Sequence, residues 1–329
     1  MLLNFEASNV LCFQNAVEFS MVSKDSTDEN LQPLNVAAVF GANNHGKTSL
    51  FRSVGTLKDC VLTGSILPVV PFNTSRDTTL EVVFRHLGVD YQYGLHLNTE
   101  SILEEWLFSG DTLIFQVVTE TTGERVCETS LTVPLTEWPC GQLLLSYLNY
   151  HEVIAPVYSW FEDVLVTQAP TFGSVQDACV NDPKLATFVQ KFLEASDVAE
   201  NSIFVESSSV QQLSNLAYLL YKATKENKVI FLDGFDVGLH LNLSLEIVRW
   251  FTRHVNTNSQ FVFSTHNTLL LDYLRRDSIW FVKKDSLGDS SLYSLLEFKK
   301  RESQTVSKDY LQGRFDGVPF LNFDSLTSD

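Results

Sequence analysis

Basic residues are scarce in this chain of 329 residues: Lys and Arg number 23 against 40 Asp and Glu, a formal net charge of −17. A protein that coats DNA needs clustered Lys and Arg to neutralise phosphates. The charge balance therefore disfavours a free-standing DNA-coating protein, although a local basic strip or a basic partner would still permit contact. The 44% of hydrophobic residues is enough for a sizeable core and excludes collagen-like, coiled-coil-dominated and disordered classes.

Cysteines and long apolar runs are also in short supply. The cysteines form no C-x-x-C pair, which argues against structural zinc or a disulfide framework and for a reducing compartment; they are Cys12, Cys60, Cys127, Cys140 and Cys179. No apolar run approaches the roughly 20 residues that span a bilayer. The first residues lack the basic and apolar regions of a signal peptide. We therefore expect a cytoplasmic protein that does not associate with membranes.

Apolar patterning first identifies a strand–loop–helix unit and an antiparallel meander. Residues 36–40, VAAVF, form a continuous apolar run, typical of a strand buried on both faces. After a Gly-bounded loop, apolar residues recur at helical spacing, at Leu50, Val54, Leu57 and Val61. Residues 78–120 alternate in polarity around turns at Gly88 and Gly110, which predicts antiparallel strands.

The second half of the chain returns to an α/β pattern after a less regular stretch. Prolines interrupt helix-like pieces between residues 135 and 200, so we expect a small helical insertion there. Beyond it, strand patterns alternate with helical ones, at 229–232, 261–265, 278–282 and 292–298. We predict an α/β fold with a mostly parallel sheet, an antiparallel β subdomain and a helical insertion. The expected lobes of this single unit are 1–65, 66–130, 131–205 and 206–329.

The strongest motif follows the strand at 36–40. Residues 41–48, GANNHGKT, fit the P-loop pattern G-x-x-x-x-G-K-[ST] at every fixed position. The glycines permit backbone geometries that aim N–H groups at phosphate oxygens, and the helix N-terminus adds its positive end. Lys47 would reach the β- and γ-phosphates, and the Thr48 hydroxyl would bind Mg²⁺. The nucleotide-binding residues expected from this loop are Gly41, Asn43, Asn44, His45, Gly46, Lys47, Thr48 and Ser49.

Two further strand ends carry polar residues that suit the same site. The apolar strand 229–232 ends at Asp233, whose carboxylate would hold Mg²⁺ together with Thr48. The strand at 261–265 is followed by His266, which would contact the γ-phosphate or position water. An isolated strand-end His more often satisfies local hydrogen bonds, but the order of the motifs along the chain favours the nucleotide site.

That order also resembles a known family, the ATP-binding-cassette (ABC) ATPases. More specifically, the chain is similar to their structural-maintenance-of-chromosomes (SMC) branch and to the small RloA-like or OLD-like "AAA family ATPase" proteins of bacterial phage-defence operons. The likeness extends over nearly the whole chain, through GANNHGKTSL, YQYGLHLNTESILEEWLF, ESSSVQQL, VIFLDGFDVGLHLNL and FSTHNTLLLD. It implies an ABC-type ATPase head that binds ATP and Mg²⁺, associates head to head as a dimer or higher homo-oligomer, and controls a separately encoded nuclease or toxin.

Departures from the family pattern predict impaired hydrolysis. The family has Glu directly after the metal-binding Asp, as the base that activates water, and here that residue is Gly234. A positioned general base is typically worth about 10²–10⁴-fold in rate. Glu206 and Asp236 lie near enough in sequence to act as substitute bases. The family's Ser-Ser-Gly-Thr signature, which would approach ATP on a dimer mate, is replaced by Ser207, Ser208, Ser209 and Val210.

Three functions are compatible with these residues. The first is an ATP-gated scaffold or sensor subunit of an anti-phage defence system, with weak or no ATP hydrolysis. The second is an active ATPase with a relocated base, in defence or in DNA repair and chromosome maintenance. The third is a nucleotide-independent structural subunit, against which the intact P-loop argues.

The basic spots Lys283–Lys284 and Lys299–Arg301 fit solvated loop charges better than a DNA-contact strip.

Overall fold

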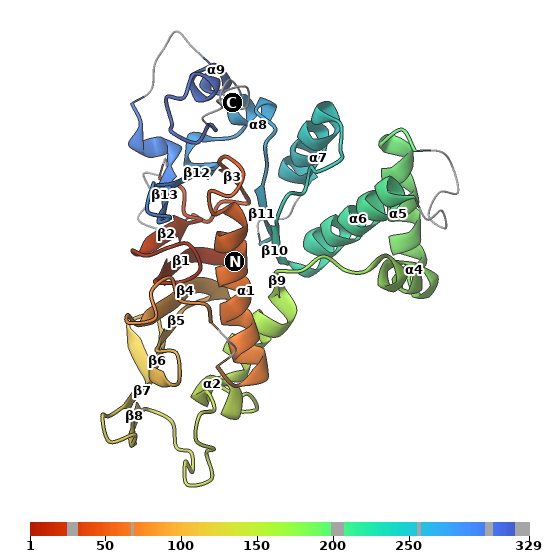
Figure 1. Ribbon diagram of the computed structural model, residues 1–329. Helices are drawn as coiled ribbons and strands as arrows, with labels where there is room; N and C mark the ends of the chain where they lie inside the picture. The colour runs from red at the N-terminus through yellow and green to blue at the C-terminus, as the bar shows by residue number, and fades with distance from the viewer. Residues whose placement is uncertain (25–31, 67–68, 199–206, 255–257, 300–304, 320–329) are drawn as a thin grey trace.

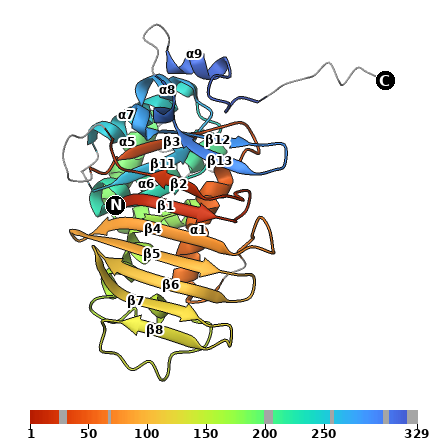
Figure 2. The same ribbon diagram turned by 90° about the vertical axis from the view of Figure 1, so that its left-hand side faces the viewer.

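The fold is built around two β-sheets. The structure, a computed structural model, describes residues 1–24, 32–66, 69–198, 207–254, 258–299 and 305–319. Figures 1 and 2 show one sheet in each half of the molecule, with helix α1 (Lys47–Thr63) beside the antiparallel one. Buried side chains of α1 belong to a core that includes residues of both sheets, so this helix joins the two halves.

The smaller sheet holds the P-loop strand in its interior. Its strand order is β13-β12-β3-β11-β10-β9, and neighbours are parallel except for β12 and β13. All five residues of β3 are buried. Ala37 and Val39 join the core with α1, whereas Ala38 and Phe40 join the core on the opposite face. The strands are β3 (Val36–Phe40), β9 (Leu165–Val166), β10 (Val229–Leu232), β11 (Gln260–Ser264), β12 (Ile279–Lys284) and β13 (Ser290–Ser294).

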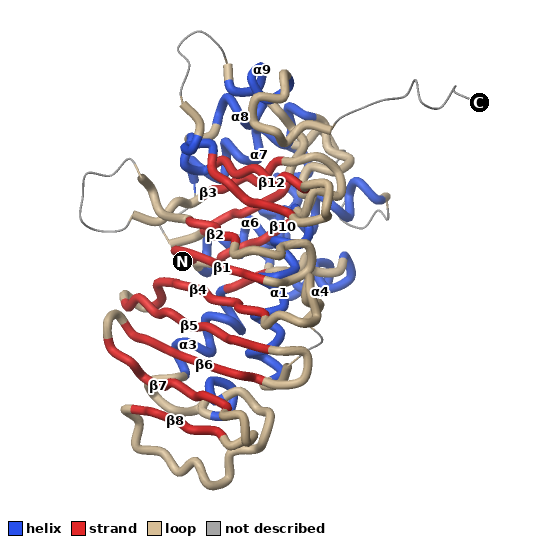
Figure 3. The backbone as a smooth tube through the Cα atoms, turned by 60° about the vertical axis from the view of Figure 1, so that its left-hand side comes forward, coloured by secondary structure: helices blue, strands red, loops and turns tan. Residues whose placement is uncertain are grey.

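The larger sheet is antiparallel throughout, in the order β2-β1-β4-β5-β6-β7-β8 (Figure 3). Two strands that precede the P-loop form one of its edges, where Phe5 of β1 lies opposite Val82 of β4. Its inner face contacts Trp160, which stacks on Phe84 with ring centroids 4.0 Å apart. The strands are β1 (Leu2–Ser8), β2 (Val17–Ser20), β4 (Thr78–His86), β5 (Val89–Leu97), β6 (Ile102–Ser109), β7 (Thr112–Thr119) and β8 (Arg125–Thr129).

The helices pack in three groups. Helices α1, α2 and α3 share the core with the antiparallel sheet, α6 to α9 cover the other face of the parallel sheet, and α4 and α5 pack on α6 (Figure 1). The helices besides α1 are α2 (Leu144–Tyr147), α3 (Ala155–Ser159), α4 (Phe172–Asn181), α5 (Pro183–Ala195), α6 (Ser208–Glu226), α7 (Leu241–His254), α8 (Leu269–Tyr273) and α9 (Val306–Leu311). No helix in the described part of the chain is long and apolar enough to cross a membrane.

The predicted α/β class is confirmed, with a mostly parallel P-loop sheet and an antiparallel β subdomain. The strand predicted at 292–298 is wrong in its second half, because Ser294 and Glu297 form a capping box that starts a 3₁₀ turn. Helices predicted between 135 and 200 exist but pack in two places, separated by the short strand β9. The division into four lobes stays a prediction.

Candidate nucleotide-binding site

The P-loop links buried strand β3 to α1 through two glycines that no larger residue would replace without strain. Gly46, the N-cap of α1, has φ of 113°, and a Cβ there would lie 2.7 Å from Cys12 Sγ. A Cβ on Gly41 would lie 2.6 Å from the Val282 carbonyl oxygen. No side chain caps the N-terminus of α1. The first N–H groups of this helix are therefore available to an anion.

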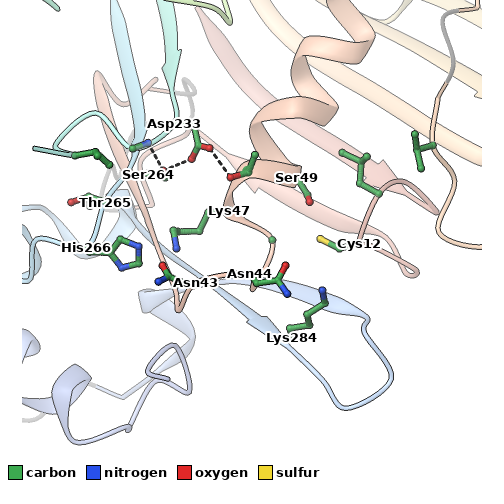
Figure 4. A pocket seen from close by; sticks show the side chains of 16 residues that line it. Cys12, Asn43, Asn44, Lys47, Ser49, Asp233, Ser264, Thr265, His266 and Lys284 are labelled. Atoms are coloured by element: carbon green, nitrogen blue, oxygen red, sulfur yellow. Dashed lines mark hydrogen bonds between the residues drawn. The ribbon is translucent and has the colours of Figure 1, made fainter. Parts of the chain in front are cut away.

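A cavity of about 460 Å³ opens against this helix terminus (Figure 4). Its wall is formed by the loop after β1, the P-loop with the start of α1, the loop between α1 and β4, and residues at or just after the ends of β10, β11 and β12. The residues that line it are Leu11, Cys12, Asn43, Asn44, Gly46, Lys47, Thr48, Ser49, Val70, Asp233, Gly234, Val237, Ser264, Thr265, His266 and Lys284. Residues far apart in the sequence thus meet at the carboxyl ends of the parallel strands, where α/β sheets bind ligands.

Lys47 is buried and folded back onto the P-loop. Its Nζ donates to the carbonyl oxygens of Gly41, at 2.8 Å, and Ala42, at 3.1 Å. Burial lowers the pKa of Lys47 below its ordinary value, while the nearby Asp233 and Asp236 carboxylates act in the opposite direction. A negatively charged partner such as a phosphate would therefore stabilise the buried ammonium group more than these two neutral carbonyl oxygens do.

Thr48 and Asp233 meet as the sequence predicts for a metal site. Thr48 Oγ1 donates to Asp233 Oδ2 at 2.6 Å, and Ser264 Oγ donates to the other carboxylate oxygen of Asp233 (Figure 4). Ser264 Oγ also accepts the Gly234 N–H at 2.7 Å. Hydroxyl and carboxylate oxygens are ligands that Mg²⁺ prefers, so the donor set fits this ion. No three His, Cys, Asp or Glu side chains converge on a metal site among the described residues, so the remaining ligands would be phosphate oxygens and water.

Gly234 brings no carboxylate to the cavity. Asp233 is the one acidic residue among those lining it. Asp236, a predicted substitute base, accepts from Thr265 Oγ1 at 2.5 Å and does not line the cavity wall. The other predicted base, Glu206, lies outside the described residues. The described residues therefore offer no second carboxylate that faces the cavity.

The predicted P-loop residues and His266 do not all line the cavity. Asn43, Asn44, Ser49 and His266 line it, whereas His45 does not. Partial burial lowers the pKa of His266, and Lys47 lowers it further. His266 is therefore a neutral imidazole near pH 7.

His45 lies in a similar electrostatic environment. Its pKa is also lowered by burial and by Lys47, and its Nδ1 is buried without a hydrogen-bond partner.

The three signature serines do not contact this cavity. Ser207 caps α6 by accepting the Val210 N–H, and Ser208 and Ser209 begin the helix. None of the three lines the wall beside Lys47. Contact with a nucleotide would require a second copy of the chain, which stays a prediction.

The sequence patterns assign no role at the site to several of the residues that line the cavity. Ser264 donates a hydrogen bond to Asp233, and Thr265 donates one to Asp236. The signal in the sequence that could have identified both residues is that they directly precede His266. Leu11, Cys12 and Val70 carried no motif. Lys284, read as a solvated charge, lines the cavity, whereas Lys283 pairs with Asp316 at 3.0 Å. Of the second basic spot, residues 300 and 301 lie outside the described residues.

Comparisons with known proteins give one family match and several distant structural ones. No curated protein matches the chain. The "SMC head domain from Thermotoga maritima" is 14% identical, with a TM-score of 0.49, covering 89% of this chain and 98% of that one. An SmcHead bound to the C-winged helix domain of ScpA is 12% identical, with a TM-score of 0.46, covering 89% and 97%. Over residues 158–272, which carry Asp233 and His266, the chain is similar to the family described as "AAA domain, putative AbiEii toxin, Type IV TA system".

Proposed function

We propose that this chain binds ATP with Mg²⁺ in the P-loop cavity and hydrolyses it slowly, as the nucleotide-gated scaffold of a defence system. The observation that carries the proposal is the combination of an uncapped helix terminus, buried Lys47 and the Thr48–Asp233 pair with Gly234 beside them. Each of the first three favours a bound triphosphate. The last removes the group that would activate water.

Each residue has a distinct task in the bound state. The N–H groups at the start of α1 hold phosphate oxygens, and Lys47 exchanges the Gly41 and Ala42 carbonyls for the β- and γ-phosphates. Thr48 and Asp233 would hold Mg²⁺, which when bound neutralises phosphate charge. Neutral His266 lines the same cavity, where its ring N–H would donate to a γ-phosphate oxygen or its other ring nitrogen would accept from a water molecule.

The proposed setting in defence rests on the family match and on the resemblance found in the sequence. The matched family's description contains a putative toxin and a type IV toxin–antitoxin system, and that description belongs to the family. A nuclease or toxin encoded separately, held by the ATP-bound chain and released on infection, is the partner that the resemblance implies. Self-association of two heads around ATP would supply the gate.

An active ATPase is the second candidate, and Asp236 favours it. Its carboxylate lies close enough to influence the pKa values of both Lys47 and His266. One of its oxygens is occupied by Thr265, so the other would have to reach the attacking water. In this case Asp236→Asn would lower steady-state turnover by about 10²-fold or more. Under the scaffold function the already slow turnover would be unchanged.

A retention experiment tests the proposed function. Purified chain, at a concentration above the expected Kd, is mixed with Mg²⁺ and radiolabelled ATP and concentrated briefly on an ultrafiltration membrane, which keeps bound and free nucleotide at equilibrium, and the nucleotide retained in excess over the filtrate is identified by chromatography. We expect nucleotide to be recovered with the protein, and most of it as ATP after several minutes. Recovery of ADP alone would favour the active ATPase, and recovery of no nucleotide would leave the structural-subunit function.

A further inference from the structure

The antiparallel sheet has one face that no helix of the described chain covers. Figure 2 shows this face toward the viewer, with α1 behind the sheet. In β4 alternate residues are buried, and Glu81 and Val83 lie between them, partly exposed on the opposite side. Such alternation is typical of an antiparallel sheet with one side in solvent. We call the solvent side of this sheet the outer face.

Three carboxylates stand side by side across three strands of the outer face. Glu6 of β1 lies directly opposite Glu18 of β2 on one side and directly opposite Glu81 of β4 on the other. We call these three residues the carboxylate row. Neighbouring strands are about 4.8 Å apart, and like charges placed directly opposite each other destabilise a sheet. Partial burial and the two neighbouring glutamates raise the pKa of Glu6 above its ordinary value.

The described residues give this row hydrogen bonds but no neutralising ion pair. None of the ion pairs among them includes a member of the row. Glu81 accepts from Gln92 Nε2 at 2.9 Å and from Trp106 Nε1 at 3.0 Å, and both donors are neutral. Trp106 lies against Gly94, where a Cβ would be 2.1 Å from the indole ring. An indole held beside carboxylates adds to their attraction for Lys or Arg, because the face of the ring also attracts cations.

A second row on the outer face is mostly apolar. Gln92 lies opposite Val83 on one side and Phe108 on the other, and Phe108 lies opposite Leu113. All four side chains are partly exposed. We call Val83, Phe108 and Leu113 the apolar row. Because Val83 follows Glu81 by two positions in β4, the two rows run side by side, about 7 Å apart.

We propose that the outer face binds an amphipathic helix of a partner protein, with Lys or Arg residues over the carboxylate row and apolar residues over the apolar row. Charge complementarity selects the cations, which would neutralise a repulsion that the free chain retains. Helix residues at i, i+3 and i+7 share one face and extend over about 10 Å, which matches three carboxylates across two strand spacings. The nucleotide site has no part in this inference, so either can fail without the other.

Fluorescence anisotropy with two labelled peptides of equal composition tests the proposal. In the ordered peptide, lysines at i, i+3 and i+7 lie beside a leucine face, whereas in the permuted peptide the lysines are spread around the helix. Each is titrated with the full chain at about 0.15 M salt, which screens long-range attraction. We expect the ordered peptide to bind about tenfold or more tightly than the permuted one. Equal affinity would show general attraction to an acidic protein and would overturn the proposal, as would binding of neither peptide.

Charge-neutralising variants locate the binding face. One variant neutralises the whole carboxylate row, by Glu6→Gln, Glu18→Gln and Glu81→Gln. The control neutralises three exposed glutamates in turns of the same sheet, by Glu100→Gln, Glu120→Gln and Glu124→Gln. We expect the first variant to bind the ordered peptide about tenfold or more weakly, and the control to lose less than about threefold. Equal losses in the two variants would contradict the assignment of the site.

Unfolding and self-association are measured on the same proteins. Since neutralisation removes repulsion between like charges, we expect the carboxylate-row variant to unfold at a urea concentration no lower than the wild type does. A lower midpoint would show that the three glutamates support the fold, and would overturn the proposal. Sedimentation velocity without peptide should give the same oligomeric state for both proteins. A wild-type oligomer that dissociates in the variant would show that a second copy of the chain occupies the outer face instead.

Discussion

Gly234 lacks a carboxylate, and its backbone is also held in a conformation that glycine adopts more easily than other residues. Its φ is 62°, and a Cβ there would lie 3.0 Å from Val237 Cγ2. A side chain in this left-handed region costs about 1–2 kcal/mol. Adding a glutamate at this position therefore changes the turn as well as the chemistry.

We predict that Gly234→Glu lowers the free energy of unfolding by about 1–2 kcal/mol and does not restore rapid ATP turnover. Gly234→Ala is the matched control, since it carries the same backbone strain without a carboxylate. Denaturant unfolding and steady-state phosphate release measure the two effects. A Gly234→Glu chain that is as stable as the wild type and turns over ATP about 10²-fold faster would contradict this reading.

Ser264 orients the carboxylate of Asp233, the Mg²⁺ ligand of the proposed function. Its hydroxyl is bonded both to Asp233 and to the Gly234 N–H, and its side chain is buried. Loss of such a supporting group typically costs about 10–100-fold in metal affinity. We predict that Ser264→Ala weakens ATP binding by this factor in Mg²⁺ and leaves binding in EDTA nearly unchanged. Thr265→Val, which removes the neighbouring hydroxyl, is the control; equal losses with and without Mg²⁺ in Ser264→Ala would indicate a purely structural role.

At the scale of elements, one buried carboxylate attaches α2 to the antiparallel sheet. Glu105 of β6 accepts the N–H groups of Leu144 and Leu145, at 2.7 and 3.0 Å, and the Tyr93 hydroxyl at 3.1 Å. Burial raises the pKa of Glu105 from 4.5 to about 7, although these hydrogen bonds oppose the rise. The folded chain therefore holds a proton that the unfolded chain releases between these pH values.

The sign of the resulting pH dependence follows from that difference. Between pH 4.5 and 7 the folded state binds more protons than the unfolded state at this residue, so rising pH destabilises the fold. We predict a loss of about 3 kcal/mol through Glu105 from pH 4.5 to above 7. Urea unfolding at pH 5 and pH 7.5 should show a smaller loss in Glu105→Gln than in the wild type. Identical losses in the two proteins would contradict the assignment.

The elements show where sequence patterns succeed and where they fail. The P-loop, β3 and α1 were predictable because a continuous apolar run, a glycine motif and helical spacing follow one another locally. The pairing of β1 with β4 was not, since it joins residues more than 70 positions apart and no local pattern specifies it. Strand β9 has two residues and is too short for any periodicity. Likewise, Asp233 was predicted from its strand, whereas its bond to Ser264 depends on the packing of two strands.

At the scale of the whole molecule, the cavity joins segments from both ends of the chain. Cys12 precedes the P-loop, and Lys284 belongs to the last parallel strand. A ligand held there contacts the loop after β1, the P-loop and the strands that follow α6. Binding would therefore stabilise the folded chain as a whole, in proportion to the logarithm of ligand concentration over Kd. Because the net charge of the chain is −17, an anionic ligand must be attracted by positive groups close to the cavity. Of the two lysines that line the cavity, Lys47 is the buried one.

Isothermal titration of ATP and Mg²⁺ into the wild type, Lys47→Ala and Lys222→Ala tests this account most directly. Lys222 lies on α6 outside the cavity, so its replacement removes the same charge without touching the site. We predict micromolar-to-millimolar binding by the wild type and by Lys222→Ala, and a loss of at least tenfold in Lys47→Ala, as expected for a charge-assisted contact worth about 1.5–3 kcal/mol. Equal ATP affinity in all three proteins, or heat of binding in none, would contradict the claim that a triphosphate is held in this cavity.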